Sequence, residues 1–361
     1  MSGSRASRSS ESGRPWVLVT DGGDADDRAA VGAVRALALG GYRPAVARSD
    51  RYALAAASRY CMRVVDVPAV TDPGYRAAIG SEIRRHRYLT VLPSHDAAMV
   101  ALDSPGGELL DKARLPERAA AAGLAVPDST SFDSGRELEG AARGLPYPVV
   151  VKPRVRGGVP SRHGAYRADD PSQIVSDPGP VVVQPYIPDR MHAVGGVIKG
   201  GVLVAAAHQR YLRTWGIDAG EASAAVTTEP DAELEERLRS LLEGYDGIFQ
   251  AQFAGEFLLD VNPRVYGSLP LAVAAGANLV RVWCDLLRGV SVPTVRARPG
   301  VRYRWIEGDL RHLWAAVRSG RLGVGRALAA LRPTPGTAHS AFTFSDPRPG
   351  LLELRHRLRR R

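Results

Sequence analysis

The chain is poor in cysteine and contains no long apolar run. Its 361 residues include two cysteines, Cys61 and Cys284, which lie far apart and have no metal-ligand spacing around them. The sequence therefore predicts free thiols in a reducing cytoplasm, not a disulfide framework or a zinc site. No apolar stretch approaches the length of a bilayer span and the N-terminus has no apolar signal core, so no membrane partner is expected.

Lysine is also scarce. Of the 48 basic residues only Lys112, Lys152 and Lys199 are lysines, and such an Arg- and Ala-rich composition is typical of a GC-rich genome. Arginine then replaces lysine wherever any cation suffices. The lysines that persist are candidates for places that need a compact ammonium group instead of a planar guanidinium.

The net charge of +10 raises the hypothesis of nucleic-acid binding. Residues 1–14 carry +2 and residues 355–361 carry +5, which leaves an ordinary +3 for the rest of the chain. Both ends are predicted to be solvated, disordered tails, and no basic stripe is interleaved with aromatic residues. We expect no specific nucleic-acid partner, and polyanion binding through the basic tails is kept as an alternative function.

Residues 249–264 (FQAQFAGEFLLDVNPR) alternate between apolar and polar side chains on both sides of a glycine, which is typical of a β-hairpin with one buried face. The apolar positions are Phe249, Ala251, Phe253, Phe257, Leu259 and Val261. We prefer a three-residue loop, 253–255, because a two-residue loop would flip one strand and scatter the polar side chains. This loop pairs Gln252 with Glu256 and places Gln252, Asp260 and Asn262 on one face.

Three oxygen-bearing side chains followed by Arg264 suit a magnesium ion that carries a phosphate. The alternative is an amphipathic hairpin whose polar face is simply solvated.

The segment Asp260-Val-Asn262-Pro-Arg264 resembles the Glu-x-Asn-Pro-Arg signature of the ATP-grasp superfamily, which includes biotin carboxylases, D-alanine–D-alanine ligase and the carbamoyl phosphate synthetase large subunit. The glutamine at Gln252 is similar to the carbamoyl phosphate synthetase pattern. The resemblance implies an enzyme that forms an acyl phosphate from a carboxylate and ATP and passes the acyl group to an amine. It also implies that Gln252, Asp260 and Asn262 hold Mg²⁺ or Mn²⁺ and that Arg264 stabilises the phosphoryl group in transit.

The N-terminal part is predicted to be a small α/β domain with a mostly parallel sheet. Strands are expected near residues 16–20, 45–47, 64–67 and 89–92, separated by helical stretches such as 26–39. The aspartates at the start of that helix would repel a pyrophosphate, so the unit is interpreted as scaffold and not as a dinucleotide site. The segment 93–96 could face a cleft, but its His95 is given no role. The arrangement resembles the domain that precedes ATP-grasp modules.

Two of the three lysines fall where the family has its nucleotide lysines. Lys112 opens a segment that resembles the family pattern of Asp-Lys, helix, Gly and Pro, with Pro116 required in the first helical turn. Lys152 ends a strand and is followed by a loop with Gly157 and Gly158, whose amides can cradle phosphates. This loop resembles the ATP-grasp lid. Lys199 is predicted to be a solvated lysine in a turn.

Residues 181–188 resemble the family's hinge strand, whose backbone faces adenine. The resemblance implies nucleotide contacts from Gln184, Tyr186, Ile187 and Asp189, although Met191 occupies the position at which the family often has an acidic ribose contact. Arg213 lies where related ligases have an arginine ahead of a glycine-rich loop. It is expected either to hold a phosphate or substrate carboxylate as a bidentate fork or to be exposed on the surface.

We therefore predict an α/β and α+β protein with an ATP-grasp fold that follows a small parallel-sheet domain. The predicted divisions are a disordered tail (1–14), the N-terminal domain (15–105), the lid subdomain (106–185), the subdomain with the metal hairpin (186–290), an extension without evident chemistry (291–354) and a basic tail (355–361). Single helices are expected over 231–243 and 271–287.

The predicted activity is that of a cytoplasmic ATP-dependent carboxylate–amine ligase, with amino acids or small peptides as substrates. Because Asp260 is shorter than the family's glutamate, a catalytically silent nucleotide-binding protein is the first alternative. The sequence leaves the oligomeric state open, and a homodimer is the state that related ligases suggest.

Overall fold

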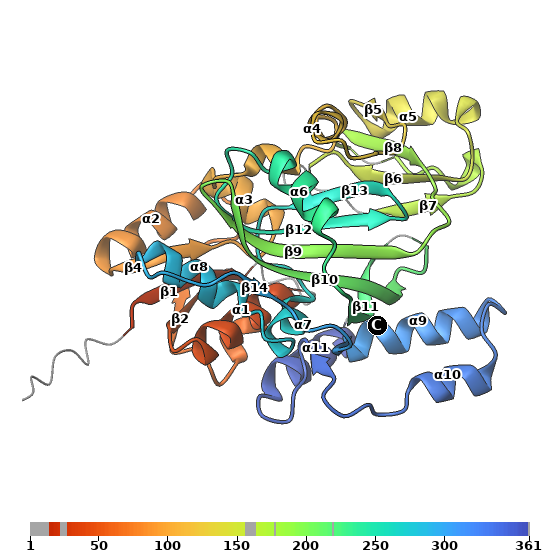
Figure 1. The fold of residues 1–361 in the computed structure, drawn as a ribbon. Helices are drawn as coiled ribbons and strands as arrows, with labels where there is room; N and C mark the ends of the chain where they lie inside the picture. Colours follow the sequence, from red (N-terminus) through yellow and green to blue (C-terminus); the bar gives the residue numbers. More distant parts are fainter. Residues whose placement is uncertain (1–13, 22–26, 156–163, 177, 219, 360–361) are drawn as a thin grey trace, which may run out of the picture.

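The computed structural model describes residues 14–21, 27–155, 164–176, 178–218 and 220–359, and it contains three β-sheets with helices packed around them (Figure 1). The mixed α/β and α+β architecture predicted from the sequence is confirmed. The first sheet has four parallel strands, in the order β3-β2-β1-β4: β1 (Trp16–Asp21), β2 (Arg43–Arg48), β3 (Arg63–Asp66) and β4 (Tyr88–Leu92).

Helices connect these strands, as parallel pairing requires. α1 (Arg28–Leu39) connects β1 to β2 and α2 (Tyr75–Arg85) connects β3 to β4, a short 3₁₀ helix (Ala55–Ala57) lies between β2 and β3, and α3 (Asp96–Leu102) follows β4. The side chain of Asp27 accepts a hydrogen bond from the Ala30 amide at 3.2 Å, and its second oxygen accepts one from Ser94 at 2.6 Å. The carboxylate therefore caps α1 and ties it to the end of β4.

The second sheet, which we call the lid sheet, is antiparallel and lies at the upper right of Figure 1. Its order is β5-β8-β6-β7, with β5 (Thr130–Phe132), β6 (Val149–Pro153), β7 (Tyr166–Ala168) and β8 (Val181–Pro185). α5 (Gly135–Ala141) packs on it through the fully buried Leu138. α4 (Leu115–Ala121) precedes the sheet and holds Pro116 in its first turn, as predicted.

The third sheet is the largest and connects the other two regions. Its order is β13-β12-β9-β10-β11-β15-β16, and β14 adds to β10. The strands are β9 (Met191–Lys199), β10 (Val202–Trp215), β11 (Glu221–Thr227), β12 (Gly247–Ala254), β13 (Phe257–Asn262), β14 (Val295–Arg296), β15 (Arg302–Arg304) and β16 (Ala338–His339). α6 (Ala232–Leu241) buries Leu238 and Leu241 against Phe249 and Phe253 on one face. Near β9 and β10 the other face packs against α1 and the apolar helices that follow the hairpin.

The single helix predicted over 271–287 is wrong. α7 (Leu269–Ala274) and α8 (Leu279–Leu287) are separate helices, and the chain between them passes through Gly276 at φ +96°. A side chain rarely adopts this left-handed conformation, so the glycine ends the first helix. The helix predicted over 231–243 is confirmed as α6.

The C-terminal residues differ from the predicted disordered basic tail. α9 (Ile306–Arg318) and α10 (Val324–Ala330) are followed by α11 (Arg348–Arg359), so residues 355–359 are helical. His356 is buried and its ring packs edge-on against Tyr52 at 4.3 Å between centroids. The basic composition of residues 355–361 did not predict this contact between the His356 and Tyr52 rings.

The subdomain boundaries remain predictions, and residues 1–13 lie outside the described part of the chain. Among the residues that the structure describes, no helix is both long and apolar enough to cross a bilayer.

Asp346 joins the C-terminal segment to the N-terminal domain. Its carboxylate is fully buried and accepts hydrogen bonds from Arg35 Nε at 2.9 Å, Ser58 Oγ at 2.7 Å and the Arg59 amide at 2.9 Å. Buried charges are tolerated only when they are paired and hydrogen-bonded in this way.

We predict that Asp346→Ala lowers the free energy of unfolding by about 3 kcal/mol, because it leaves Arg35 without its buried counter-charge. Urea denaturation measures this change. Asp66→Ala is the matched control: Asp66 is 75% exposed in its ion pair with Arg48, so the expected loss is below about 1 kcal/mol. Equal losses in the two variants would contradict the structural role of Asp346.

Candidate functional site

The hairpin of β12 and β13 gathers four polar side chains on one sheet face. Gln252 pairs with Asp260 and Gln250 pairs with Asn262, and directly opposed residues of antiparallel strands project to the same side. Figure 1 shows the two strands at the edge of the large sheet that lies nearest the lid sheet.

The register of the hairpin corrects the sequence prediction. The turn is the two-residue Gly255-Glu256, between the paired Ala254 and Phe257, so the three-residue loop and the pairing of Gln252 with Glu256 are wrong. A β-bulge places one extra residue, Leu259, in β13. Beyond the bulge, the side chains of β13 again project to the faces that the sequence predicted. The polar residues consequently share a face as predicted, while Leu258 takes the buried position expected for Leu259.

The polar face forms a continuous hydrogen-bonded chain. Gln252 Nε2 donates to the Tyr211 hydroxyl at 2.9 Å, Asn262 Nδ2 donates to Gln252 Oε1 at 3.5 Å, and Arg264 donates to Asn262 Oδ1 at 3.0 Å. Burial raises the pKa of Tyr211 well above its ordinary value, so its hydroxyl stays protonated at neutral pH. These bonds fix the orientation of the amide groups on the hairpin.

Lys112 and Lys152 converge on β13 from two other elements. Lys112 Nζ lies 3.2 Å from Asp260 Oδ1, and Lys152, from β6, donates to the Leu259 carbonyl at 2.6 Å. Both are nearly buried, at 4% and 7% exposure. Lys199 instead is the last residue of β9, next to the predicted turn, and its side chain is 41% exposed and paired with Asp246. Lys112 and Lys152 are therefore buried beside β13 and Lys199 is partly exposed, while the nucleotide contacts of the first two remain predictions.

The segment that carries Lys112 is fixed to the end of β6. Arg154 forms a bidentate pair with Asp111, with both bonds at 2.8 Å, and the Lys112 amide donates to the Arg154 carbonyl at 3.1 Å. The hydrogen bonds from Arg154 lower the pKa of Asp111 below its ordinary value. This pair holds the two lysine-bearing segments side by side.

Arg264 extends from the hairpin toward the N-terminal domain. Its Nε donates to Asp96 Oδ1 at 2.5 Å, and its Nη1 donates to the Ser94 carbonyl at 3.3 Å. Burial alone would lower the pKa of the Arg264 guanidinium, but Asp96 outweighs that effect and the pKa is raised. Sequence analysis gave Asp96 no role. Its position at the start of α3, four residues after the parallel strand β4 and in a segment expected to face a cleft, was the available signal.

The other predicted residues have their own local surroundings or lie outside the described residues. Gln184 is buried and donates to Ser129 Oγ at 2.8 Å, and the guanidinium of Arg167 lies 4.2 Å from the centre of the Tyr186 ring. Ile187 is half-buried and Asp189 is exposed. Gly157 and Gly158 lie outside the described residues.

Arg213 is bound by an acidic residue of the C-terminal region. It forms a bidentate pair with the fully buried Asp309 of α9, at 2.5 and 3.0 Å. The fork expected to hold a ligand is therefore occupied by a carboxylate almost a hundred residues away in the sequence.

The donor set fits a magnesium ion that arrives with nucleotide phosphates. Among the described residues, no three His, Cys, Asp or Glu side chains gather into a metal site. Asp260 supplies one carboxylate, 24% exposed, and Gln252 and Asn262 add amide oxygens on the same face. Magnesium commonly takes one or two protein carboxylates and completes its coordination with phosphate oxygens and water.

No protein-family model matches the chain. In sequence it is similar to the carbamoyl phosphate synthase large chain of Vibrio vulnificus, with 23% identity over 220 residues that cover 55% of this chain and 20% of the relative. The chain thus spans about a fifth of the length of the curated relatives it matches.

Three solved structures show the same fold at low identity. Carboxyaminoimidazole ribonucleotide synthase from Aspergillus clavatus, complexed with ATP, superposes with a TM-score of 0.59 at 13% identity, covering 79% of this chain and 80% of that one. The biotin carboxylase domain of Hydrogenobacter thermophilus 2-oxoglutarate carboxylase, with MgADP, gives 0.57 at 13% identity over 80% and 73%. L-amino acid ligase from Bacillus licheniformis gives 0.53 at 13% identity over 76% and 74%. The chain therefore has the ATP-grasp fold that its signature segment predicts, and the proteins it resembles are enzymes.

Close packing beneath the hairpin gives a direct test of the site's geometry. Gly195 of β9 pairs with Gln250, and a Cβ added at Gly195 would lie 2.0 Å from the hydroxyl of the buried Tyr266, two residues after Arg264. We predict that Gly195→Ala displaces Tyr266 and lowers the free energy of unfolding by about 2 kcal/mol, measured by urea denaturation.

Gly140→Ala is the control for this substitution. Gly140 lies in α5 with no heavy atom within 4 Å of an added Cβ, so alanine there is expected to be neutral or to raise stability by up to about 1 kcal/mol. A Gly195→Ala protein as stable as the wild type would show that Tyr266 is not held as described.

Proposed function

We propose that the chain is an ATP-dependent carboxylate–amine ligase that forms an amide through an acyl-phosphate intermediate. The observation that carries the proposal is the convergence of Lys112 and Lys152 on β13. This strand carries Asp260 and Asn262, and Arg264, two residues after Asn262, donates a hydrogen bond to the Asn262 side chain. Buried ammonium groups next to oxygen ligands suit a triphosphate, because a buried cation is stable only beside negative charge. The likeness to an L-amino acid ligase supports amino acids or small peptides as substrates.

In this proposal the lysines position the nucleotide phosphates. Lys152 reaches them from β6, Lys112 reaches them from the segment before α4, and the amides of Gly157 and Gly158 close over them. The adenosine contacts assigned to Gln184, Tyr186, Ile187 and Asp189 belong to the same proposal. Structures of neighbours with ATP and MgADP support nucleotide binding by this fold.

Gln252, Asp260 and Asn262 would hold Mg²⁺ or Mn²⁺. When bound, such an ion neutralises negative charge on the triphosphate and so favours attack by an anionic carboxylate. The hydrogen bonds among Gln252, Asn262 and Tyr211 hold the amide oxygens in place, which reduces the reorganisation required on binding.

The reaction needs no protein nucleophile. A carboxylate oxygen of the substrate attacks the γ-phosphorus, the bond to the bridging oxygen breaks, and ADP leaves with the electron pair. The guanidinium of Arg264 stabilises the charge on the transferred phosphoryl group. An amine then attacks the acyl carbon, phosphate leaves, and the amine nitrogen loses a proton to give the amide.

The predicted substrate contact of Arg213 is not included, because the fork of Arg213 is occupied by Asp309. A cytoplasmic location is part of the proposal and is consistent with the free thiols of Cys61 and Cys284. A homodimer is also part of the proposal, because the structurally similar biotin carboxylase domain is named as a dimer.

The activity is tested by magnesium-dependent ADP release with pooled amino acids and small carboxylic acids, with hydroxylamine present to trap an acyl phosphate as a hydroxamate. We expect a carboxylate-dependent hydroxamate signal that falls at least about a hundredfold in Lys152→Ala and Lys112→Ala, since each loses a charge-assisted contact to the phosphates. Lys199→Ala, which removes the remaining lysine, should retain full activity. MgATP binding without any carboxylate-dependent turnover would favour the silent nucleotide-binding alternative.

The role of Asp260 predicts a specific dependence on divalent cations. Asp260→Asn removes the carboxylate from the donor set, so the magnesium concentration required for half-maximal ADP release should rise at least about tenfold. Asp66→Asn, at an exposed carboxylate, should leave this concentration unchanged. An unaltered magnesium requirement in Asp260→Asn would exclude Asp260 as a ligand. If side-chain length limits the natural enzyme, Asp260→Glu should raise its activity.

A further inference from the structure

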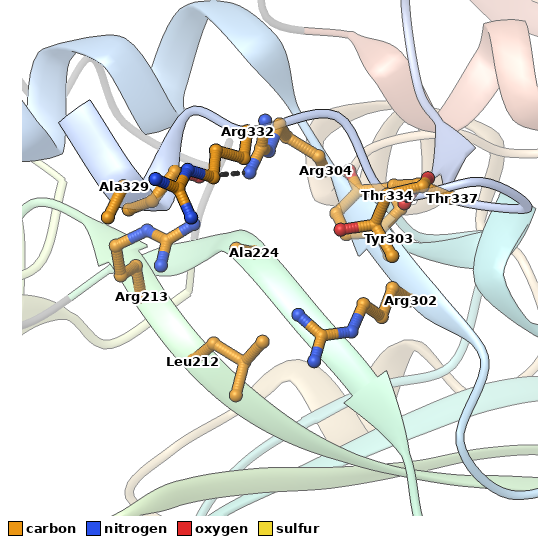
Figure 2. A pocket seen from close by; sticks show the side chains of 11 residues that line it. Leu212, Arg213, Ala224, Arg302, Tyr303, Arg304, Ala329, Arg332, Thr334 and Thr337 are labelled. Atoms are coloured by element: carbon orange, nitrogen blue, oxygen red, sulfur yellow. Dashed lines mark hydrogen bonds between the residues drawn. The ribbon is translucent and has the colours of Figure 1, made fainter. Parts of the chain in front are cut away.

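A cavity of about 140 Å³ lies between the large sheet and the chain that follows α10 (Figure 2). Arg213 from β10 and Arg302 and Arg304 from β15 enter it from the sheet, and Arg332 enters it from the overlying segment. Leu212 also lines the cavity, and its side chain is 37% exposed to solvent. Four guanidinium groups therefore surround one small space.

Two of the cavity's arginines, Arg213 and Arg304, lie in a row of the sheet next to the row that faces the hairpin. Tyr211, Ala225 and Tyr303 are aligned across β10, β11 and β15, and the Tyr211 hydroxyl reaches Gln252 of the hairpin. The adjacent row, Arg213, Ala224 and Arg304, lines the cavity. Because neighbouring rows of a sheet project to opposite sides, the side chains of Arg213 and Arg304 point away from the face on which Tyr211 reaches Gln252, while Tyr303 also contributes to the cavity lining.

The positive charge in the cavity is only partly compensated. The buried Asp309 accepts the bidentate pair from Arg213 and lies 3.2 Å from Arg304. Arg304 also donates to the carbonyl groups of Ala330 and Leu331, which fixes the segment above the cavity. Within the part of the chain that the structure describes, the side chains of Arg302 and Arg332 make no hydrogen bond or ion pair. Two guanidinium groups are thus available to an anion.

We propose that this cavity is a second binding site, for a small molecule that carries a phosphate group. Guanidinium forks donate pairs of parallel hydrogen bonds to phosphate oxygens, and a tetrahedral dianion can accept them from several directions at once. Arg302 and Arg332 approach from different elements, and the hydroxyl of Thr334 lines the same space. A dianion there also offsets the mutual repulsion of the four arginines. The proposal does not depend on the ligase activity.

The test is isothermal titration of the full chain with inorganic phosphate and, in a second arm, with glycerol 3-phosphate. We expect saturable binding that weakens about tenfold or more in Arg302→Gln/Arg332→Gln, because two charge-assisted contacts are lost. Arg318→Gln/Arg326→Gln removes the same charge from exposed positions outside the cavity lining, and it should bind as the wild type does. Tighter binding of glycerol 3-phosphate identifies a phosphorylated metabolite as the ligand, and tighter binding of inorganic phosphate identifies the free ion.

A second comparison separates this cavity from the nucleotide site. Lys152→Gln should retain the phosphate affinity of the wild type, and Arg302→Gln/Arg332→Gln should retain the wild-type affinity for MgATP. The proposal is overturned if the wild type shows no saturable binding of either probe, if the cavity variant binds as tightly as the wild type, or if phosphate binding is lost in Lys152→Gln.

Discussion

The contacts of Lys112 and Lys152 with β13 are the constraint on which the candidate site depends. The two lysines come from segments that the Asp111–Arg154 pair holds together, and both reach the stretch of β13 at its bulge. Without the extra residue at Leu259, Asp260 would project to the buried face and Lys112 would have no carboxylate to meet. The β-bulge thus places the Asp260 carboxylate on the same face of the hairpin as Gln252, where it meets Lys112.

The same hairpin joins the three regions of the fold. Its buried face packs under α6, Lys152 connects it to the lid sheet, and Arg264 connects it to Asp96 of the N-terminal domain. In the proposed function, a site formed between these regions holds phosphates with cations from one side and with a metal bound by oxygen-bearing side chains from the other. The proposed catalysis rests on positioning and electrostatics, which suits the lysines, the arginine and the oxygen-bearing side chains that the described residues bring together.

Much of this arrangement could be predicted from the sequence, because local patterns encode it. The alternation in 249–264 predicted two strands, and the resemblance to the family selected Lys112 and Lys152 from the three scarce lysines. The two-residue turn was considered and rejected, because period-two reasoning admits no extra residue and therefore no compensating bulge. The partners of Arg264 and Arg213, Asp96 and Asp309, lie far away in the chain, and no local pattern encodes such contacts. The order of α11 likewise depends on tertiary packing that its charged composition conceals.

The central claim, that the chain activates a carboxylate as an acyl phosphate, is tested most directly by oxygen transfer. The carboxylate that supports hydroxamate formation would be labelled with ¹⁸O in its carboxyl group, and the phosphate released during turnover with MgATP and an amine would be analysed by mass spectrometry. The account predicts that each phosphate carries one labelled oxygen, because the carboxyl oxygen that attacked the γ-phosphorus leaves with it. Unlabelled phosphate released together with labelled amide would contradict an acyl-phosphate intermediate.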